Sequence, residues 1–422
     1  MSLTSQQVAI IQATVPVLKQ HGEHITTTFY RHLLEENPAL KNVFGMTNML
    51  TGRQPKALAH GLLAYASHIT EPAVLADFVE KVSHKHASLG VEPAQYAVVG
   101  KYLLAAMAEV LGGDAFTPDV HDAWAAAYWI LANIMIEREA QIYGEDPAWT
   151  GFRPLVVVSK QQESDEITSF YLEAPPSSDG AQAQPQPLPS FKPGQYVSVR
   201  LRVPGTEFLQ PRQYSLSQAP NGRQYRISVK REPRVADLPE PAFISNLMHD
   251  RVHEGDRIDV SHPRGAFFFD PERAEQRGAP VVLISAGVGI TPMMSILGVL
   301  AEEQGEGEGE GAARPVHMIH GARSSKVLAF DDDVRRICRD RSSVRRTLFL
   351  KNPVAGAVRG VDYDFASRVK LDELDGAKDL FLDDERALYF VCGPDTFMDD
   401  VARFLEGQGV AASRVRQEKF GV

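Results

Sequence analysis

The sequence predicts a multidomain protein in which an all-α domain is followed by an antiparallel β-barrel and then by a doubly wound α/β domain. Residues 1–147 carry long amphipathic helical patterns and almost no strand-like alternation. Short β-branched and aromatic runs begin at Phe152, and strand-like and helix-like segments alternate after about Pro280. We therefore expect domains over residues 1–147, 152–272 and 278–422.

Composition and charge exclude several classes of protein. With 422 residues and a net charge of −10, the chain is too long for one hydrophobic core and too acidic to favour a nucleic-acid or anionic-membrane partner. Cys338 and Cys392 are the only cysteines, and the N-terminal MSLTSQQVAI has no basic segment before an apolar core. We expect a cytoplasmic protein, most simply a monomer, that acts on small molecules.

Each part of the chain can be divided further. In the helical part, the expected breaks lie at Gly22, Pro38, Pro72, Pro93 and Pro118. In the barrel part, the expected strands are LVVVSK, EITSFYLEA, GQYVSVRLRV, RQYSLSQ and QYRISVKRE. In the α/β part, the expected strands are VVLISAG, PVHMIHGA, RRTLFL and LYFVCGP.

One barrel strand has the composition of a flavin site. Downstream of Tyr196, it places a cation, an aromatic ring and a hydroxyl together in Arg212, Gln213, Tyr214 and Ser215. Arginine can neutralise a pyrophosphate, tyrosine can stack on or hydrogen-bond a flavin ring, and serine can reach a ring heteroatom. Side chains alternate along a strand, so Arg212 and Tyr214 share a face. Alone the match is weak, because these residues are ordinary in exposed strands.

The α/β part contains a glycine-rich loop within an uncharged stretch, residues 281–300, that is long enough to span a bilayer. The loop is Gly287, Val288, Gly289, Ile290, Thr291 and Pro292. Its glycines and proline interrupt the stretch, so we expect a buried strand, a phosphate-binding loop and a helix. Downstream, Cys392, Gly393 and Pro394 close another parallel strand at the end where a dinucleotide would lie. Taken singly, the loop could be a plain turn and Cys392 a core residue.

In this order the motifs resemble the ferredoxin-NADP reductase family, from about residue 152 to the end. The resemblance implies FAD in the barrel, NAD(P)H in the α/β domain, and hydride transfer between them. The family's glycine-bearing turn before its pyrophosphate-binding Val-Ser segment appears here as Pro241 to Asn246, with Ser245 in the serine position. NADH and NADPH both stay open, because Arg323, before Ser324 and Ser325, either contacts a 2′-phosphate or faces water.

The helical part carries two histidines in KVSHKHASLG. Apolar residues at positions 75, 79, 82 and 89 mark one helix face, and His86 falls on it. His84 lies about 200° around the helix, beside Glu80 and Lys81, where we expect solvent. From the residues alone, His86 is either a core histidine held by hydrogen bonds or the iron ligand of a haem on a globin-type helix.

Over essentially its full length, the chain resembles the flavohaemoglobins, in which a globin is fused to such a reductase. KHASLG, Tyr96 and the run Arg138-Glu139-Ala140 carry the match in the helical part. The resemblance implies haem b with His86 as its iron ligand, and Tyr96 and Glu139 hydrogen-bonded around the imidazole, which would increase electron donation to iron. Without it, Tyr96 would be interpreted as core and Glu139 as a solvated helix residue.

The same resemblance implies a ligand pocket on the other side of the haem. It assigns Tyr30 to hydrogen-bonding O2, Gln54 and Leu58 to shaping the pocket, and Phe44 to packing on the haem face. Gln54 and Leu58 stand four residues apart, hence on one helix face. Pro55, directly after Gln54, leaves the orientation of that glutamine open.

The C-terminal run QEKFG matches a family segment near the flavin. The resemblance therefore implies that Glu418, Phe420 and Gly421 contact the cofactor, and that Glu418 approaches Lys85 beside the iron ligand, which would orient the flavin edge toward the haem. Otherwise Glu418 and Lys85 are typical surface charges.

The activity that the resemblance implies is that of a nitric oxide dioxygenase, which converts NO and O2 to nitrate with electrons from NAD(P)H passed through FAD to haem. The alternative is a haem-based O2- or NO-binding or sensing protein whose reductase keeps the iron ferrous. A plain flavin reductase with a haem-free helical domain is a third interpretation.

Overall fold

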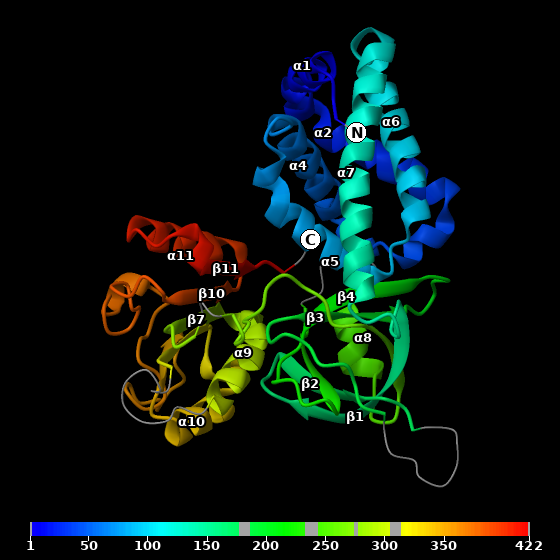
Figure 1. Cartoon of the computed structure of the whole chain (residues 1–422). Coiled ribbons are helices and arrows are strands. Elements are labelled where there is room, and N and C mark those ends of the chain that lie inside the picture. The colour runs from blue at the N-terminus through cyan, green and yellow to red at the C-terminus, as the bar shows by residue number, and fades with distance from the viewer. Residues whose placement is uncertain (1, 177–185, 233–243, 274–276, 304–313, 421–422) are drawn as a thin grey trace.

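The expected fold class is confirmed by the computed structural model, which describes residues 2–176, 186–232, 244–273, 277–303 and 314–420. Figure 1 shows the helical unit standing on the β-barrel, with the α/β unit beside the barrel. The long helix α7 runs through the helical unit down to the barrel, where the chain passes from one to the other.

The helical unit is built from nine consecutive elements. They are α1 (Ser5–Ala13), α2 (Val15–Glu36), η1 (Pro38–Asn42), α3 (Met46–Leu50), α4 (Arg53–Ser67), η2 (Pro72–Leu75), α5 (Ala76–Leu89), α6 (Pro93–Ala115) and α7 (Pro118–Gly144). Four of the expected proline breaks are the first residues of η1, η2, α6 and α7, where the missing N–H of proline costs no helical hydrogen bond. The expected break at Gly22 is wrong: this residue lies inside α2, facing Ala59 of α4.

Two apolar segments have the length of a membrane span. By length and composition alone, α6 is such a helix, but it buries Tyr102, Leu103 and Met107 in the core of the helical unit. Residues 281–300 are divided as expected into a strand, a short 3-10 turn and a helix, and most of their side chains are buried in the α/β unit.

The barrel is a six-stranded antiparallel sheet with the order β4-β3-β6-β1-β2-β5. Its elements are β1 (Phe152–Gln162), β2 (Ile167–Glu173), β3 (Tyr196–Arg202), β4 (Leu209–Ser215), β5 (Gln224–Lys230), α8 (Ile244–Arg251) and β6 (Arg257–Ser261). The ends of the sheet approach each other just beyond β4, where Leu216 forms an antiparallel bridge with Ile227 of β5. This bridge closes the sheet around an apolar interior that includes Phe170, Leu172 and Val229.

The α/β unit is a five-stranded parallel sheet with the order β11-β10-β7-β8-β9. Its elements are β7 (Val281–Ala286), η5 (Gly287–Gly289), α9 (Ile290–Glu302), β8 (Val316–Ala322), η6 (Ser325–Val327), α10 (Asp331–Asp340), β9 (Val344–Leu350), η7 (Leu371–Glu373), β10 (Leu388–Cys392), α11 (Asp395–Gly407), η8 (Ala412–Arg414) and β11 (Val415–Glu418). One apolar cluster joins α9 and α10 to the sheet, and a second joins α11 to it. The sheet is therefore covered on both faces, as a doubly wound fold requires.

Candidate functional site

His86 lies near the end of α5, and its ring is held by two residues from different helices. Its Nδ1 is 2.8 Å from Oε1 of Glu139 in α7 and 2.9 Å from the hydroxyl of Tyr96 in α6. The Tyr96 hydroxyl donates to the same carboxylate oxygen at 2.5 Å. Because this oxygen only accepts, it takes the Nδ1 hydrogen of His86, and Nε2 is left as the nitrogen with a lone pair for a metal.

The carboxylate of this triad is deeply buried. Glu139 is 2% exposed and Tyr96 is 7% exposed, so the interpretation of Glu139 as a solvated helix residue is wrong. Burial and the adjacent carboxylate raise the pKa of Tyr96, which keeps the phenol protonated as a donor. The hydroxyl of Tyr128 donates to the backbone oxygen of Tyr96 at 2.5 Å and fixes that part of α6.

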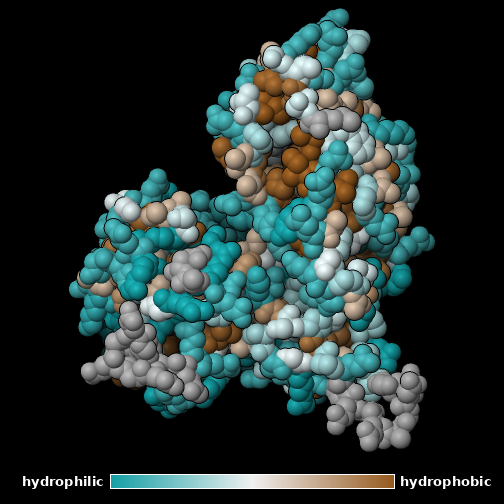
Figure 2. Space-filling view, viewed as in Figure 1, coloured by the Kyte–Doolittle hydropathy of each residue, from teal (hydrophilic) through white to brown (hydrophobic). Residues whose placement is uncertain are grey.

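The donor set around His86 fits a haem rather than a metal held by protein alone. Within the described residues, no group of three or more His, Cys, Asp or Glu side chains could hold a metal ion. The side chain of His86 is 30% exposed, whereas that of its partner Glu139 is 3% exposed. Figure 2 shows hydrophobic residues gathered around a hollow on the helical unit, a surface suited to an apolar macrocycle. One imidazole with a free Nε2 is the ligand that a globin-type haem needs from the protein.

A second polar pair lies in the main core of the helical unit. Gln54, in the first turn of α4, donates from Nε2 to the Tyr30 hydroxyl at 3.0 Å, so Pro55 does not turn the glutamine away. Tyr30 packs edge-on against Phe44, with 5.4 Å between ring centroids, and Leu58 is half-buried against the same cluster. Burial raises the pKa of Tyr30 to about 12. The structure thus brings together the four residues expected around a bound gas.

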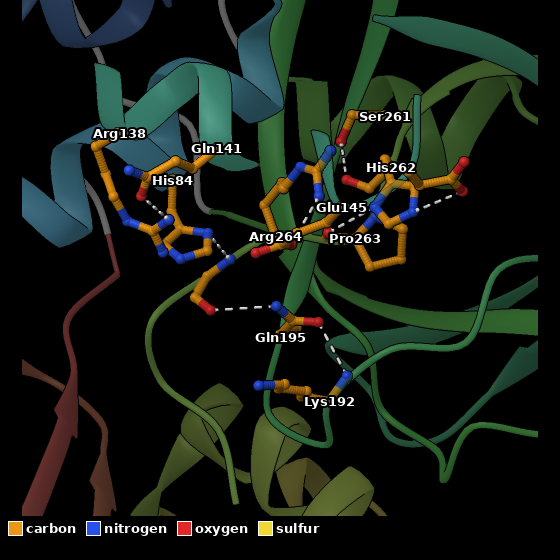
Figure 3. Close-up of polar contacts among 12 residues, drawn as sticks. His84, Arg138, Gln141, Glu145, Lys192, Gln195, Ser261, His262, Pro263 and Arg264 are labelled. Atoms are coloured by element: carbon orange, nitrogen blue, oxygen red, sulfur yellow. Dashed lines mark hydrogen bonds and ion pairs between the residues drawn. The ribbon is translucent and has the colours of Figure 1, made fainter. Parts of the chain in front are cut away.

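His84 does not face solvent as expected. It is 4% exposed, because the face of α5 that carries it is covered by the barrel. Its Nδ1 accepts a hydrogen bond from the backbone N–H of Gly265 at 3.2 Å, and its Nε2 lies 3.1 Å from Glu80. Figure 3 shows His84 between Arg138 of the helical unit and the strands of the barrel. Burial lowers the pKa of His84, which favours the neutral ring.

The expected flavin residues lie on neighbouring strands. Tyr196 of β3 is directly opposite Ser215 of β4, and Tyr214 packs against the barrel core. Gln213 donates from Nε2 to the hydroxyl of Ser198 at 3.1 Å. Ser215 is buried. These contacts order the two strands on which a flavin ring would lie.

Arg212 makes a contact that its motif did not predict. Its Nη2 donates to Oγ1 of Thr47 in α3 at 2.6 Å, so the guanidinium bridges the barrel and the helical unit. Two residues earlier on β4, Gln210 joins the same two units: its Oε1 accepts from Met46 N at 2.8 Å, and its Nε2 donates to Lys41 O at 3.1 Å. The strand expected to bind flavin is therefore also a docking strand for the segment that carries Phe44.

Part of the expected flavin-phosphate segment, residues 241–243, lies outside the described residues. Its described part begins α8, and the hydroxyl of Ser245 accepts a hydrogen bond from the backbone N–H of Glu232 at 3.3 Å. Ser245 is thus at the start of a helix, where backbone N–H groups can meet a phosphate.

The glycine-rich loop and the Cys-Gly-Pro segment meet at the carboxyl ends of β7 and β10. Gly289 is so close to the second segment that a Cβ would overlap the carbonyl oxygen of Cys392 and lie 2.8 Å from Gly393 N. Thr291 donates its hydroxyl to Val288 O at 2.9 Å. Of the remaining expected residues, Gly287 has a φ of 57°, Ile290 and Pro292 are buried in α9, and Pro394 caps α11. Residues that were expected to bind the nucleotide come from distant parts of the chain, and they lie together at one edge of the sheet.

Arg323 follows β8 and forms an ion pair with Glu166 of the barrel. The Arg323 side chain is 67% exposed, so it faces water apart from this ion pair, and Glu166 would compete with a phosphate for the guanidinium.

The C-terminal strand brings Glu418 to the centre of the molecule. In the parallel pairing of β11 with β10, Glu418 is opposite Cys392. Burial raises the pKa of Glu418 to about 7, against the opposing effect of Lys81 and Lys85 of α5. Burial also lowers the pKa of Lys85, which the charge of Glu418 partly offsets. Phe420 is 41% exposed, and Gly421 lies outside the described residues.

Several residues at the contact between the helical unit and the barrel were not singled out from the sequence. They are Glu80, Ser88, Ser198, Gln210 and Gly265. His84 was singled out but was expected to face solvent. The only available signal was that Glu80, His84 and Ser88 form a row at four-residue spacing on α5, and a solvated helix face has the same pattern.

Family models match two parts of the chain. The globin model matches residues 27–135, and the model of the oxidoreductase NAD-binding domain matches residues 283–403. Among solved structures, the flavohemoglobin from Malassezia yamatoensis with bound FAD and heme is 27% identical, with a TM-score of 0.83 and 100% of both chains covered. The Flavohem-like FAD/NAD binding domain of nitric oxide dioxygenase from Vibrio cholerae O1 biovar El Tor is 33% identical, with a TM-score of 0.52, covering 64% of this chain and 99% of that chain.

Whole-length relatives give the family directly. The flavohemoprotein of Bordetella pertussis is 44% identical over 419 residues, which cover 98% of this chain and 97% of that protein. The flavohemoprotein of Chromobacterium violaceum is 44% identical over 423 residues, which cover 99% of this chain and 98% of that protein. With a globin match, an NAD-binding match and this identity along its length, the chain belongs to the flavohaemoprotein family.

Proposed function

We propose that this protein is a nitric oxide dioxygenase that converts NO and O2 to nitrate with electrons from NAD(P)H. The observation that carries the proposal is the buried carboxylate of Glu139, 2.8 Å from Nδ1 of His86. A carboxylate at this position makes an imidazole a stronger electron donor to iron, which favours O2 activation over simple storage. The Vibrio cholerae relative described as a nitric oxide dioxygenase supports the same assignment.

Three cofactors divide the work among three parts of the chain. In this proposal residues 1–147 hold haem b through His86, residues 152–272 hold FAD, and residues 278–422 bind NADH or NADPH. When bound, haem supplies the iron at which O2 and NO meet, and FAD divides the two electrons of a hydride into single electrons. Two NO and two O2 consume one NAD(P)H and give two nitrate ions, one NAD(P)+ and one proton.

The residues around His86 fix its proton and orientation. Glu139 holds the hydrogen at Nδ1, so Nε2 keeps the lone pair that iron requires. Tyr96 donates to the same oxygen of Glu139 and satisfies part of the charge that burial would otherwise destabilise.

In the proposed ligand pocket, Tyr30 would donate a hydrogen bond to O2. Gln54 donates to the Tyr30 oxygen, so the hydroxyl hydrogen of Tyr30 remains available for another acceptor. The raised pKa of Tyr30, about 12, keeps this hydrogen in place at physiological pH. Phe44 and Leu58 exclude water around the donor.

In the reductase part, Tyr196, Gln213, Tyr214 and Ser215 hold the flavin ring, with Arg212 and Ser245 toward its phosphates. The loop from Gly287 to Pro292 and the segment from Cys392 to Pro394 hold the nucleotide, and Glu418 and Phe420 contact the flavin. Lys85 and Glu418 couple the two halves. The reaction takes place in the cytoplasm, where NAD(P)H is regenerated.

The test uses the purified holoprotein with a limiting amount of NADH under air. Pulses of NO are followed with an electrode, and nitrate and NADH are measured afterwards. The proposal predicts rapid NO consumption, with one NADH oxidised for two nitrate ions formed. A protein that only binds or senses the gas would retain NO without nitrate formation, and its NADH oxidation would not respond to NO.

A further inference from the structure

The helix that carries His86 also docks on the barrel, through its other side. His84 and Ser88 stand four residues apart and share a face of α5 roughly opposite to that of His86. His84 accepts from Gly265 N at 3.2 Å, and the Ser88 hydroxyl lies 2.9 Å from that of Ser198 in β3. The width of one helix therefore separates the proposed iron ligand from the barrel.

The hydrogen bonds of His84 determine which nitrogen is protonated. A backbone N–H can only donate, so Nδ1, which faces Gly265, is the unprotonated nitrogen and Nε2 carries the hydrogen. Nε2 lies 3.1 Å from Glu80, whose carboxylate is gripped by Nε and Nη2 of Arg138 in α7 at 2.6 and 2.8 Å. Both ring nitrogens are engaged and the side chain is 5% exposed, so the ring has one orientation.

At the other end of the contact, Gly265 lies directly on Tyr196. Its φ is 129°, and a Cβ there would be 3.0 Å from two ring carbons of Tyr196. The carbonyl of Gly265 accepts from Nε2 of Gln195 at 3.3 Å. Since Tyr196 is paired with Ser215, His84 is connected through one residue, Gly265, to both strands of the flavin motif.

We propose that His84 is a positioning residue that holds the flavin-binding face of the barrel in place against the proximal helix. This inference rests on one part of the proposed function, namely that the chain binds both haem and FAD. The step that it serves is the passage of one electron, supplied by NADH, from reduced flavin to ferric iron. No proton or group moves through His84, which acts only by fixing Gly265 and, through it, Tyr196.

Three substitutions separate the two hydrogen bonds of His84. His84→Ala removes both. His84→Asn can present its Oδ1 near the place of Nδ1 and so keep the bond to Gly265, whereas His84→Gln reaches toward Glu80 and loses Gly265. His121→Ala is the matched control, because His121 is an exposed histidine of α7 with a partner in the helical unit only.

The first measurement is hydrogen exchange of the peptide that contains Gly265, followed by mass spectrometry in the full chain. Loss of one hydrogen bond of about 1 kcal/mol raises the open population, and with it the exchange rate, about fivefold. We expect this acceleration in His84→Ala and His84→Gln, and exchange close to that of the native protein in His84→Asn and His121→Ala.

The second measurement is an anaerobic stopped-flow experiment in which NADH is mixed with the oxidised holoprotein and the flavin and haem bands are followed separately. We expect unchanged flavin reduction in all variants, and haem reduction slowed several-fold only in His84→Ala and His84→Gln. Equal slowing of both steps, unchanged exchange at Gly265 in His84→Ala, or failure of His84→Asn to restore haem reduction would overturn the inference. If the native protein forms no nitrate but these patterns hold, only the dioxygenase proposal fails.

Discussion

Glu139 accepts hydrogen bonds from His86 and Tyr96 at one oxygen while only 2% of the residue is exposed. A buried carboxylate costs several kcal/mol of folding free energy unless it is compensated, and here the hydrogen bonds from His86 and Tyr96 compensate it. It fixes the tautomer of His86 and places a negative charge behind the ring.

Glu139→Gln tests this relationship. The amide keeps the shape but removes the charge, so the imidazole becomes a weaker donor. We expect NO dioxygenase turnover to fall roughly 10- to 100-fold, the usual effect of changing a residue that supports a metal ligand. The iron–histidine stretching frequency, measured by resonance Raman spectroscopy on the ferrous protein, should decrease. An unchanged frequency would show that Glu139 does not polarise His86.

Tyr30→Phe removes the proposed hydrogen bond to O2 and leaves the ring that packs on Phe44. A hydrogen bond worth about 1.4 kcal/mol corresponds to a tenfold loss of O2 affinity, which a titration of the reduced protein would measure. Leu58→Ile, which keeps the pocket apolar, is the control. Equal O2 affinities of the native protein and Tyr30→Phe would contradict the role of Tyr30.

The ionisation of Tyr30 predicts how folding stability and O2 affinity depend on pH. Its folded pKa of about 12 lies above the ordinary 10.0, because burial disfavours the phenolate. The contribution of Tyr30 to the free energy of unfolding is therefore fully present below pH 10 and is lost as the pH rises through 12. O2 affinity should be independent of Tyr30 ionisation between about pH 6 and 10. A Tyr30-dependent loss of O2 affinity near pH 8, absent in Tyr30→Phe, would contradict this.

Gly289→Ala should disable the nucleotide site. The new methyl group would overlap the backbone of Cys392, which cannot rotate away as a side chain could. We expect a loss of about 1–3 kcal/mol of folding free energy and a marked slowing of flavin reduction by NADH. Gly407→Ala, at the end of α11 with open space around it, should change neither quantity. Similar behaviour of the two variants in melting and NADH assays would count against the close contact.

Gln210→Ala should loosen the helical unit where it docks on β4. It leaves Met46 N and Lys41 O without the side chain that now bonds both, at a cost of about 1–3 kcal/mol. Chemical denaturation of the holoprotein would measure this cost, with the exposed Gln12→Ala as control. Because Phe44 lies between these two contacts, the rate of CO binding to the reduced protein should change as well. A free energy of unfolding equal to that of the control would remove Gln210 from the docking contact.

The parts of the molecule that depend on contiguous residues were predictable. Three kinds of feature are determined by a few neighbouring residues: the prolines that begin helices, the loop from Gly287 to Pro292 and the strand that contains Tyr214. The four-residue strand β11, VRQE, was not predicted, because it is too short and polar to show alternation and exists by pairing with β10.

Contacts between the units could not be predicted in the same way. His84 and Gln210 are buried by parts of the chain far away in sequence, and a polar residue that faces another domain has the same local pattern as one that faces water. Glu139 was identifiable only through the family resemblance, since a charged residue on a long helix is usually exposed. The structure identifies the hydrogen-bond partners of His84, Gln210 and Glu139, and these partners explain why the three side chains are buried.

The most direct test compares absorption spectra of the purified native protein and of His86→Ala. Both are supplied with haem and FAD during expression. Spectra are recorded before and after NADH is added in the absence of O2 and the presence of CO. The account predicts flavin bands in both proteins, but a haem Soret band that shifts to the CO form on adding NADH only in the native protein. A native protein that contains FAD without haem, or a variant with the same haem content and shift, would contradict the assignment of His86 as the iron ligand.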